Sequence, residues 1–506
     1  MVLNDNTLVD LFARNARQQG DRGALLINHE RLSHGAFHAA TERLAQGLAV
    51  AGVRHGDRVA VLAGNRPEVL LLLCAVARLG AILVPINTRM SAHEVGHVLT
   101  DAAPLLLLAE SAFVPLADTF CGRRYALDAV PSGWQPFADL TPSLVAPLPD
   151  AAKAGDGVLM IYTAAVSGQQ RGALLSQRNL VAASQLLGQR LQLGPSDVLL
   201  GALPLYHVAG IGFALACQIA GGATLLLERF DAPAAVQAID KQRVTLCVTF
   251  SPMLAALLDA ALVSGTALGS LRVVSGLEAG DTIVRLEAQC PQVRFWSGYG
   301  QTEISSAVCI APYRERPGAA GRAAPPSEVA VADPAGQLLP PGQTGEIVVR
   351  GPTVFLGWWD AGTRRAIAPP GDWHHTGDLG RLDQEGYLWY AGRAPHKALI
   401  KTGGENVYPE EVELALLAHP AVAAAVVFGV PDSHWGEAVR AVCVKQPQQE
   451  VGADELIEFV ASRIARFKRP REVIFVERLP ALPDGAVNRT AVAQAHSSPG
   501  TVAGTP

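Results

Sequence analysis

The chain has 506 residues, of which 49% are hydrophobic and 17% charged, so it can bury a full core and is not a mostly disordered protein. Its 41 Lys and Arg against 46 Asp and Glu give a net charge of -5, which argues against nucleic acid as the main partner. Seven singly scattered cysteines with no CxxC indicate neither zinc nor disulfides, and with an N-terminus that lacks a signal-peptide core they favour the cytoplasm.

Short apolar runs alternate with longer helical patterns through the N-terminal part of the chain. This alternation predicts an α/β fold in which helices cover parallel sheets. No membrane span is expected, because the two most apolar stretches are broken by charged residues, prolines or glycines. The clearest strand-like runs are residues 58–62, 157–162, 223–227 and 244–248, and the clearest helical patterns are residues 34–52 and 66–80.

The texture of the sequence changes twice toward the C-terminus. Residues 326–391 consist of short segments separated by Gly and Pro turns, which is typical of a β-rich subdomain. Residues 392–490 have the helix and strand rhythm of a separate compact unit, with a helix starting at Pro409. The last residues are small and polar, and we expect a flexible tail over 491–506.

The segment Tyr162 to Ser176 begins as a strand and continues into a turn-rich loop. Backbone N–H groups in such a loop can hold phosphate oxygens, and a guanidinium can neutralise them. A surface hairpin is the alternative reading of this segment alone. The candidate phosphate contacts are Thr163, Ser167, Gly168 and Arg171.

Three further segments follow in a fixed order. The first is SGYGQTE at 297–303, which places an aromatic ring, a hydroxyl and a carboxylate within five positions. The second is HTGD at 375–378, followed by Arg393, and the third is KALIKTGGENVYP at 397–409. No single segment is decisive, and their joint occurrence carries the inference.

These motifs, in this order, resemble those of the adenylate-forming superfamily of acyl-CoA synthetases, adenylation domains and luciferases, over nearly the whole chain. The resemblance implies a large N-terminal domain of two αβ-layered subdomains plus a β-barrel, over residues 1–392. A small mobile α+β domain over 393–490 would then rotate between adenylation and thioester formation.

The resemblance also assigns roles at the nucleotide site. It implies that Glu303 binds Mg²⁺, that Thr302 donates to the α-phosphate, and that Tyr299 offers a face to adenine. It implies that Asp378 accepts both ribose hydroxyls and that Arg393 is a second ribose contact. The remaining implied nucleotide contacts are Gly276, Leu277, Glu278 and Gly300.

The acid pocket is expected along residues 205–213, 276–280 and 297–305. Neither the first nor the last of these stretches contains Arg or Lys, so a second carboxylate would lack a partner there. We therefore expect an apolar monocarboxylate: aromatic, alicyclic or medium-chain. His207 is expected beside the substrate carboxylate or as a gate, with a packed core histidine as the alternative. The other expected pocket residues are Val208, Gly212, Gly298 and Ser305.

In the C-terminal segment, the resemblance fits Lys397 to a hinge and Lys401 to the thioester-forming conformation. Two extra residues between Arg393 and Lys397 leave Pro395 and His396 as other hinge candidates. Gly403 and Gly404 suit a tunnel for the pantetheine arm of CoA, and a tight turn is the alternative.

Two departures from the family pattern concern catalysis. Ala164, Ala165 and Val166 replace hydroxyl residues of the phosphate loop, and Arg171 replaces a lysine. Ala486 stands in PDGAVNR where the family has a lysine that reaches the substrate carboxylate and the α-phosphate. An intact flanking motif is what a deliberate Lys to Ala change would leave, and natural loss is the alternative.

The sequence thus predicts an ATP-, Mg²⁺- and CoA-dependent carboxylate–CoA ligase that is impaired in adenylation by Ala486. The alternatives are an adenylating enzyme that transfers to a carrier protein or an amine, and a catalytically silent ligand-binding homologue. The expected partners are a small carboxylic acid, ATP and CoA, and a homodimer is left open.

Overall fold

The computed structural model describes residues 6–27, 30–143, 148, 152–163, 170–394, 399–402, 405–432, 435–482 and 487–497. The described residues form two compact units. The first takes residues 6–88, 95–163 and 171–394, and the second takes 89–94, 170 and the residues from 399 onward. The division after Ala394 falls next to the boundary that the sequence predicts at residue 392. No helix in the described part of the chain is long and apolar enough to cross a membrane.

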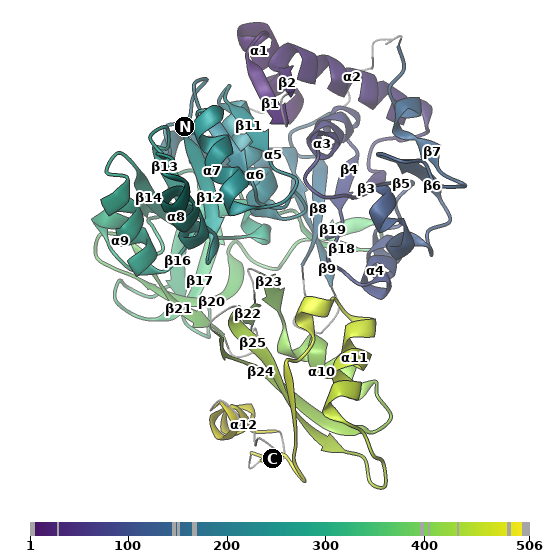
Figure 1. Ribbon diagram of the computed structural model, residues 1–506, viewed down its shortest axis with the longest axis vertical. Coiled ribbons are helices and arrows are strands. Elements are labelled where there is room, and N and C mark those ends of the chain that lie inside the picture. The colour runs from purple at the N-terminus through teal and green to yellow at the C-terminus, as the bar shows by residue number, and fades with distance from the viewer. Residues whose placement is uncertain are drawn as a thin grey trace. The chain divides into compact units, whose positions relative to one another are not determined.

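The first unit contains an eight-stranded sheet whose central strands are parallel, as the apolar runs predict. Helices α7 (Ala232–Lys241), α8 (Met253–Ser264) and α9 (Gly280–Gln289) cover one face (Figure 1). In order across the sheet, the strands are β15 (Ser306–Pro312), β14 (Arg294–Gln301), β13 (Val273–Leu277), β12 (Leu246–Phe250), β10 (Val198–Gly201), β11 (Ala223–Leu226), β1 (Gly23–Ile27) and β2 (Glu30–Ser33).

A nine-stranded sheet lies in the same unit, and its central strands are buried on both faces. One continuous apolar core joins the two sheets through the helices between them. The strands, in order, are β19 (Arg365–Ile367), β18 (Gly357–Asp360), β9 (Arg171–Ser176), β8 (Gly157–Thr163), β4 (Ile82–Pro85), β3 (Arg58–Leu62), β5 (Leu106–Ala109), β6 (Arg123–Ala126) and β7 (Gln135–Pro136). The remaining helices of this part of the chain are α1 (Leu8–Gln19), α2 (His34–Val50), α3 (Pro67–Leu79), α4 (Ala92–Ala102), α5 (Gln177–Arg190) and α6 (Val208–Ile219).

Local sequence explains where several of these helices begin and end. The Thr7 and Asp10 side chains form a capping box at the start of α1, and the Ser176 and Asn179 side chains do the same for α5. Helix α3 starts with proline and ends at Gly80 in the left-handed region, which only glycine adopts without strain.

The expected β-rich segment forms an open four-stranded antiparallel sheet rather than a closed barrel in the described pairings: β16 (Glu328–Ala332), β17 (Gly345–Arg350), β20 (His374–Leu382) and β21 (Leu388–Arg393). Strands β18 and β19, which we assigned to this subdomain from their position in the chain, instead extend the nine-stranded sheet, because β18 pairs with β9. This pairing supports the residues that follow the phosphate loop.

The second unit is α+β, as expected. Its sheet contains β23 (Glu405–Val407), β22 (Ile400–Thr402), β25 (Gly436–Lys445), β24 (Val422–Asp432) and β26 (Glu472–Phe475). Helices α10 (Pro409–Leu417) and α11 (Ala453–Arg463) share its apolar core. The helix predicted at Pro409 is confirmed, with proline in the first turn.

Part of the segment 491–506, which we expected to be a flexible tail, is helical. Residues Arg489–His496 form helix α12, in which Val492 is buried against Val426 and Val442. Arg489 donates from Nη1 to Glu413 Oε2 at 2.9 Å, which ties the start of α12 to α10. A short amphipathic helix after a polar stretch is a weak signal, so composition alone misassigned it.

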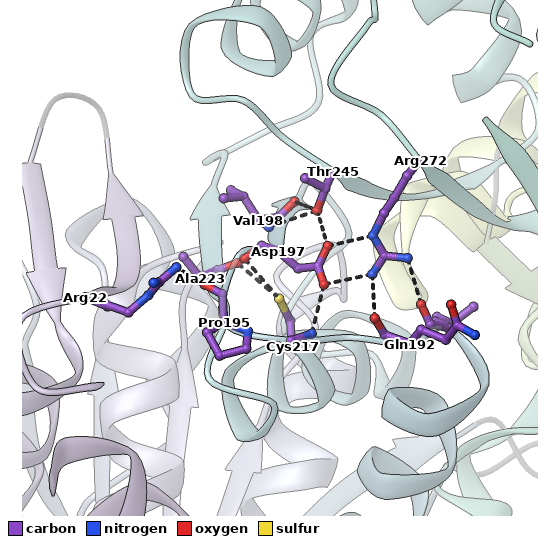
Figure 2. A network of polar contacts seen from close by, with 11 residues as sticks. Arg22, Gln192, Pro195, Asp197, Val198, Cys217, Ala223, Thr245 and Arg272 are labelled. Atoms are coloured by element: carbon purple, nitrogen blue, oxygen red, sulfur yellow. Dashed lines mark hydrogen bonds and ion pairs between the residues drawn. The ribbon is translucent and has the colours of Figure 1, made fainter. Parts of the chain in front are cut away.

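A polar network fixes the edge of the eight-stranded sheet where β10, β12 and β13 begin (Figure 2). Asp197 accepts from Arg272 Nε and Nη2, both at 2.8 Å, and from Thr245 Oγ1 at 2.7 Å. Burial by itself would raise the pKa of Asp197, but the hydrogen bonds from Arg272, Thr245 and the Gly194 amide outweigh it and hold the pKa below its usual range.

Candidate active site

The first part of the candidate site is the turn that joins β14 to β15. Thr302 and Glu303 lie in a short 3₁₀ helix over Thr302–Ile304, and the Glu303 side chain is buried. A Cβ on Gly300 would lie 1.7 Å from the Ser306 carbonyl oxygen, so only glycine fits at this approach of the two strands. The predicted Gly300, Thr302 and Glu303 are therefore brought together by one constrained turn.

The backbone after this turn is held in an uncommon conformation. Ser305 and Ser306 have φ of 60° and 100°, in the left-handed region that non-glycine residues rarely adopt. The Ser305 hydroxyl donates to the Thr353 carbonyl at 2.7 Å and is buried, so this predicted pocket residue makes its side-chain contact within the protein. Such conformations persist where surrounding structure enforces them, and they cluster at functional sites.

Tyr299, Asp378 and Arg393 form one constellation. The Tyr299 hydroxyl donates to Asp378 Oδ2 at 2.7 Å, and Arg393 Nε lies 3.2 Å from Asp378 Oδ1. Burial and the nearby Asp378 carboxylate raise the pKa of Tyr299 well above its usual range, so the phenol stays a donor at neutral pH. Strand pairing aligns Asp378 in β20 with Arg393 in β21. The two predicted ribose contacts and the predicted adenine contact are thus adjacent.

The segment of β20 that carries Asp378 is held by the neighbouring strand β17. The Thr376 hydroxyl donates to the Ile347 carbonyl at 2.6 Å, and the Gly377 amide donates to Glu346 Oε1 at 2.7 Å. These bonds explain why Thr and Gly precede the aspartate: one supplies a short hydroxyl and the other turns at φ +70°.

Gly276 and Leu277 end β13, which pairs with β14, and Glu278 follows the strand. Gly276 pairs with Thr249 and with Ser297, and a Cβ there would lie 1.8 Å from the Thr249 carbonyl oxygen. Leu277 is exposed, whereas burial raises the pKa of Glu278, whose Oε1 accepts from the Leu254 amide at 3.2 Å. The Thr249 backbone occupies the space that a side chain at position 276 would take, so glycine is required there.

The predicted phosphate loop lies between two paired strands. Thr163 ends β8 and Arg171 begins β9, and the two residues pair across the hairpin. Ser167 and Gly168 lie outside the described residues, as do Ala164, Ala165 and Val166. Arg171 is exposed, and its guanidinium lies 4.6 Å from the ring of Trp358.

The predicted acid-pocket residues gather around the start of α6. His207 precedes the helix with its ring edge-on to Tyr206 at 4.8 Å. Gly212 packs closely enough on Ser306 that an added Cβ would lie 3.1 Å away, and one on Gly298 would lie 3.2 Å from the Cys309 carbonyl. Val208 and Ala209 of α6 are partly buried and border the main core, as do Phe250, Met253 and Ala307 from other segments.

One cation near this region was missed from the sequence. Arg190, at the end of α5, lies 6.0 Å from the ring of Trp296 and donates to the Ile310 carbonyl at 3.0 Å. Arg190 could not be predicted here because it lies in a different segment of the chain, and only tertiary packing brings α5 to β14 and β15.

In the second unit, Lys401 lies in β22 with an exposed side chain, and its backbone N–H donates to Glu437 Oε2 at 2.6 Å. Three predicted residues of the hinge and tunnel fall outside the described residues, as does the alanine at the position of the expected lysine: Lys397, Gly403, Gly404 and Ala486.

A basic hollow on the second unit was not predicted. The Arg471 guanidinium lies 5.0 Å from the Trp435 ring, and Arg89 lies 5.0 Å from the Phe467 ring. Arg89 and Arg466 pair with Glu405 and Glu458, whereas Arg469 and Arg471 have no ion pair among the described residues. The lining residues are Arg89, Thr402, Trp435, Arg466, Phe467, Arg469 and Arg471. Excess guanidinium charge beside aromatic faces suits a phosphorylated heterocycle.

The described residues contain no group of three or more His, Cys, Asp or Glu side chains that could hold a metal by itself. Mg²⁺ usually keeps its waters and binds through one or two carboxylates plus substrate phosphates. Glu303, in the same short helix as Thr302, stays the carboxylate predicted for the metal.

A constrained β14–β15 turn with a carboxylate, next to a tyrosine–aspartate–arginine constellation, defines the class: an enzyme that forms adenylates from ATP. The family model for AMP-binding enzymes matches residues 12–359, and the model for their C-terminal domain matches residues 411–485. The chain belongs to the AMP-binding enzyme family.

Relatives of known activity align over nearly the whole chain. An indoleacetate–CoA ligase of Aromatoleum aromaticum is 36% identical and covers 96% of this chain and 98% of its own. A feruloyl-CoA synthase of Amycolatopsis is 34% identical and covers 94% of this chain and 96% of its own. A double mutant of o-succinylbenzoate CoA synthetase from Bacillus subtilis, solved with a product analogue, is 27% identical with a TM-score of 0.85, over 97% and 99% of the two chains.

The chain is an AMP-forming acyl-CoA synthetase. It joins a small carboxylic acid to CoA through an acyl-adenylate and requires ATP, Mg²⁺ and CoA. The resemblance stated from the motifs is thereby confirmed, as are the class of reaction and the cofactors.

Proposed function

We propose that the acid is an apolar monocarboxylate: aromatic, alicyclic or medium-chain. The observation that supports this proposal is that Val208 and Ala209, in the predicted acid segment at the start of α6, are apolar and only partly buried. Arg190, whose guanidinium lies 6.0 Å from the Trp296 ring, donates from Nη2 to the Ile310 carbonyl. A second buried carboxylate would need a dedicated partner to offset its desolvation.

Indoleacetate and ferulate, which two of the relatives carry in their names, are monocarboxylates with one aromatic system. They support the aromatic members of the proposed class. The solved relative named for o-succinylbenzoate acts on a dicarboxylate, so the acid class of this chain rests on its own residues.

In the first half-reaction, an acid carboxylate oxygen attacks the α-phosphorus of ATP, forms the acyl–phosphate bond and releases pyrophosphate. The carboxylate and the ATP phosphates are both negatively charged, so cations and hydrogen-bond donors must stabilise the charge that develops in the transition state. Thr302 is proposed to donate to the α-phosphate and Arg171 to the departing phosphates. Glu303 would hold Mg²⁺, which would neutralise phosphate charge.

The adenosine part is proposed to bind at the neighbouring groups. Tyr299 presents its ring, Gly276 and Gly300 permit close backbone approach, and Asp378 with Arg393 holds the ribose. Because Tyr299 and Arg393 already engage Asp378, that carboxylate is oriented before the nucleotide arrives. Leu277 and Glu278 complete the proposed adenine side.

In the second half-reaction, the CoA thiol attacks the acyl carbonyl and AMP leaves. The basic hollow supports CoA as the acceptor, because CoA carries a 3′,5′-phosphorylated adenosine. A free amine has no such group to bind there. Lys401 is proposed to serve this half-reaction, and Lys397, Gly403 and Gly404 stay proposed as hinge and tunnel residues from the resemblance.

Ala486 is proposed to impair adenylation, because no ammonium extends from that position to the α-phosphate. His207 is proposed as the gate or carboxylate neighbour of the acid.

The test is an acid panel scored by pyrophosphate release and acyl-CoA formation, run on this chain and on Ala486→Lys. Glu303→Gln serves as the inactive control. We expect aromatic, alicyclic and medium-chain monocarboxylates to be used in preference to dicarboxylates. Preference for a dicarboxylate would contradict the acid class. If product formed only with an amine or a carrier protein, that acceptor would take the place of CoA in the proposal. If neither chain released pyrophosphate in the presence of any acid, a catalytically silent homologue would be favoured.

A further inference from the structure

Two consecutive tryptophans on β18 each lie over an arginine. The Arg171 guanidinium carbon is 4.6 Å from the Trp358 ring centroid, and that of Arg58 is 5.4 Å from the ring of Trp359. Successive side chains of a strand point to opposite faces of a sheet, so the two tryptophans lie on opposite faces and contact different residues. Trp359 Nε1 donates to the Asp101 carbonyl at 3.0 Å and is buried, which marks it as a packing residue.

Trp358 is held in place by other rings. Its ring is edge-on to Phe355 at 5.2 Å, and Phe355 is edge-on to His374 at 5.3 Å. The Phe355 amide donates to the Glu303 carbonyl at 2.9 Å. The row of rings is therefore tied to the turn that carries the proposed metal-binding carboxylate. Edge-to-face contacts of this kind fix ring orientation.

Arg171 has no carboxylate partner among the described residues, where its guanidinium lies over the Trp358 ring. A ring over the guanidinium plane covers one face and leaves the in-plane N–H groups open to hydrogen-bond acceptors. Pairing of Trp358 with Ala173, two residues after Arg171 in β9, keeps ring and guanidinium on neighbouring strands.

We propose that Trp358 is a positioning residue that holds the Arg171 guanidinium for the β- and γ-phosphates of ATP. This role rests on the proposed function, which assigns Arg171 to the phosphates. AMP lacks both phosphates, so Trp358 should affect ATP binding and leave AMP binding alone. A residue that merely stabilised the fold would not separate the two nucleotides.

The test is isothermal titration of the full chain with Mg-ATP and with AMP. An exposed arginine–aromatic contact corresponds to roughly a two- to fivefold change in affinity. Trp358→Leu should weaken ATP by about that factor and leave AMP unchanged, whereas Trp358→Phe should retain most of the affinity. Trp359→Phe, at the neighbouring tryptophan over Arg58, is the matched control and should change neither nucleotide.

A double-variant cycle separates positioning from packing. If Trp358 acts through Arg171, Trp358→Leu should add no further loss to Arg171→Ala. Equal weakening of ATP and AMP, or a full additional loss in the Arg171→Ala background, would overturn the positioning role. Failure of the unmodified chain to bind ATP at all would instead overturn the proposed function, and the positioning role with it.

Discussion

The nucleotide site depends on a few residues whose neighbours leave them little freedom. Tyr299 illustrates this, because its hydroxyl is committed to Asp378 and its raised pKa keeps the proton on the phenol. Gly276 and Gly300 illustrate it differently, since any side chain would collide with a carbonyl oxygen. A substitution at Tyr299 should therefore affect function through the lost hydrogen bond, whereas a substitution at Gly276 or Gly300 should distort the local backbone.

Glu303→Gln should reduce Mg²⁺-dependent ATP use by about 10²-fold or more, because the amide keeps the shape and loses the charge that holds the metal. The unfolding temperature should stay close to that of the unmodified chain. Glu328→Gln, in the exposed pair with Arg350, is the matched control. Undiminished activity at saturating Mg²⁺ would remove Glu303 from the metal site.

Arg469→Ala should raise the KM for CoA about tenfold, since a hydrogen bond to a charged group contributes roughly 1.5–3 kcal/mol. Acid-dependent pyrophosphate exchange, which does not involve CoA, should be unchanged. Arg463→Ala, whose guanidinium lies over Phe459 on α11 outside the hollow, is the control. An unchanged KM for CoA would mean that the basic hollow serves another purpose.

At the scale of elements, the strand ends of the eight-stranded sheet are fixed on one side by a polar network and carry the site on the other. Asp197 and Arg272 tie the starts of β10 and β13 together, while Gly276 and Leu277 end β13 at the site. Paired, hydrogen-bonded charges of this kind are costly to break from one side.

Asp197→Ala should lower the free energy of unfolding of the first unit by about 2–3 kcal/mol, below the full cost of a buried pair because Arg272 is partly exposed. Its lowered pKa means that the stabilisation is present above the unfolded-state value near pH ~4 and is lost as the pH falls through the folded-state pKa. Denaturant unfolding curves of the unmodified chain and of Asp197→Ala should therefore differ at pH 7 and coincide in acid. An equal difference at both pH values would contradict the linkage.

Lys401→Ala, on β22 of the second unit, should slow transfer of a preformed acyl-adenylate to CoA more than it slows adenylate formation. The substitution leaves the backbone hydrogen bond to Glu437 in place, so the strand should survive. Lys445→Ala, in an exposed pair with Glu450, is the control. Single-turnover measurement of each half-reaction decides the matter, and equal slowing of both would contradict a role specific to transfer.

For the whole molecule, the sequence predicted the parts that local pattern encodes. Apolar runs predicted the parallel strands, and the YGQTE and TGD motifs predicted the residues that the structure brings together as Tyr299, Asp378 and Arg393. Pairing between distant segments was not predictable: β18 joined β9, and Trp358 thereby came to lie over Arg171. The same applies to the basic hollow, whose arginines look like ordinary surface charge in the sequence.

Ala486→Lys should raise the adenylation rate by roughly 10²- to 10³-fold, the usual cost of deleting one donor from a preorganised site. Thioester formation from a preformed acyl-adenylate should change far less. Single-turnover kinetics with separate quantification of acyl-adenylate and acyl-CoA measures both steps. A lysine variant no faster than the unmodified chain would mean that another group supplies the charge, or that the alanines of the phosphate loop have disabled the site.

The central claim is that this chain couples an acid to CoA through an acyl-adenylate. It is tested most directly by quantifying all products from ATP, Mg²⁺, an aromatic monocarboxylate and CoA, with this chain and with Ala486→Lys. We predict AMP, pyrophosphate and acyl-CoA in equal amounts, with acyl-adenylate accumulating when CoA is left out, and faster turnover with the lysine. ADP and phosphate as products, or acyl-CoA formed without any acid-dependent pyrophosphate, would contradict the account.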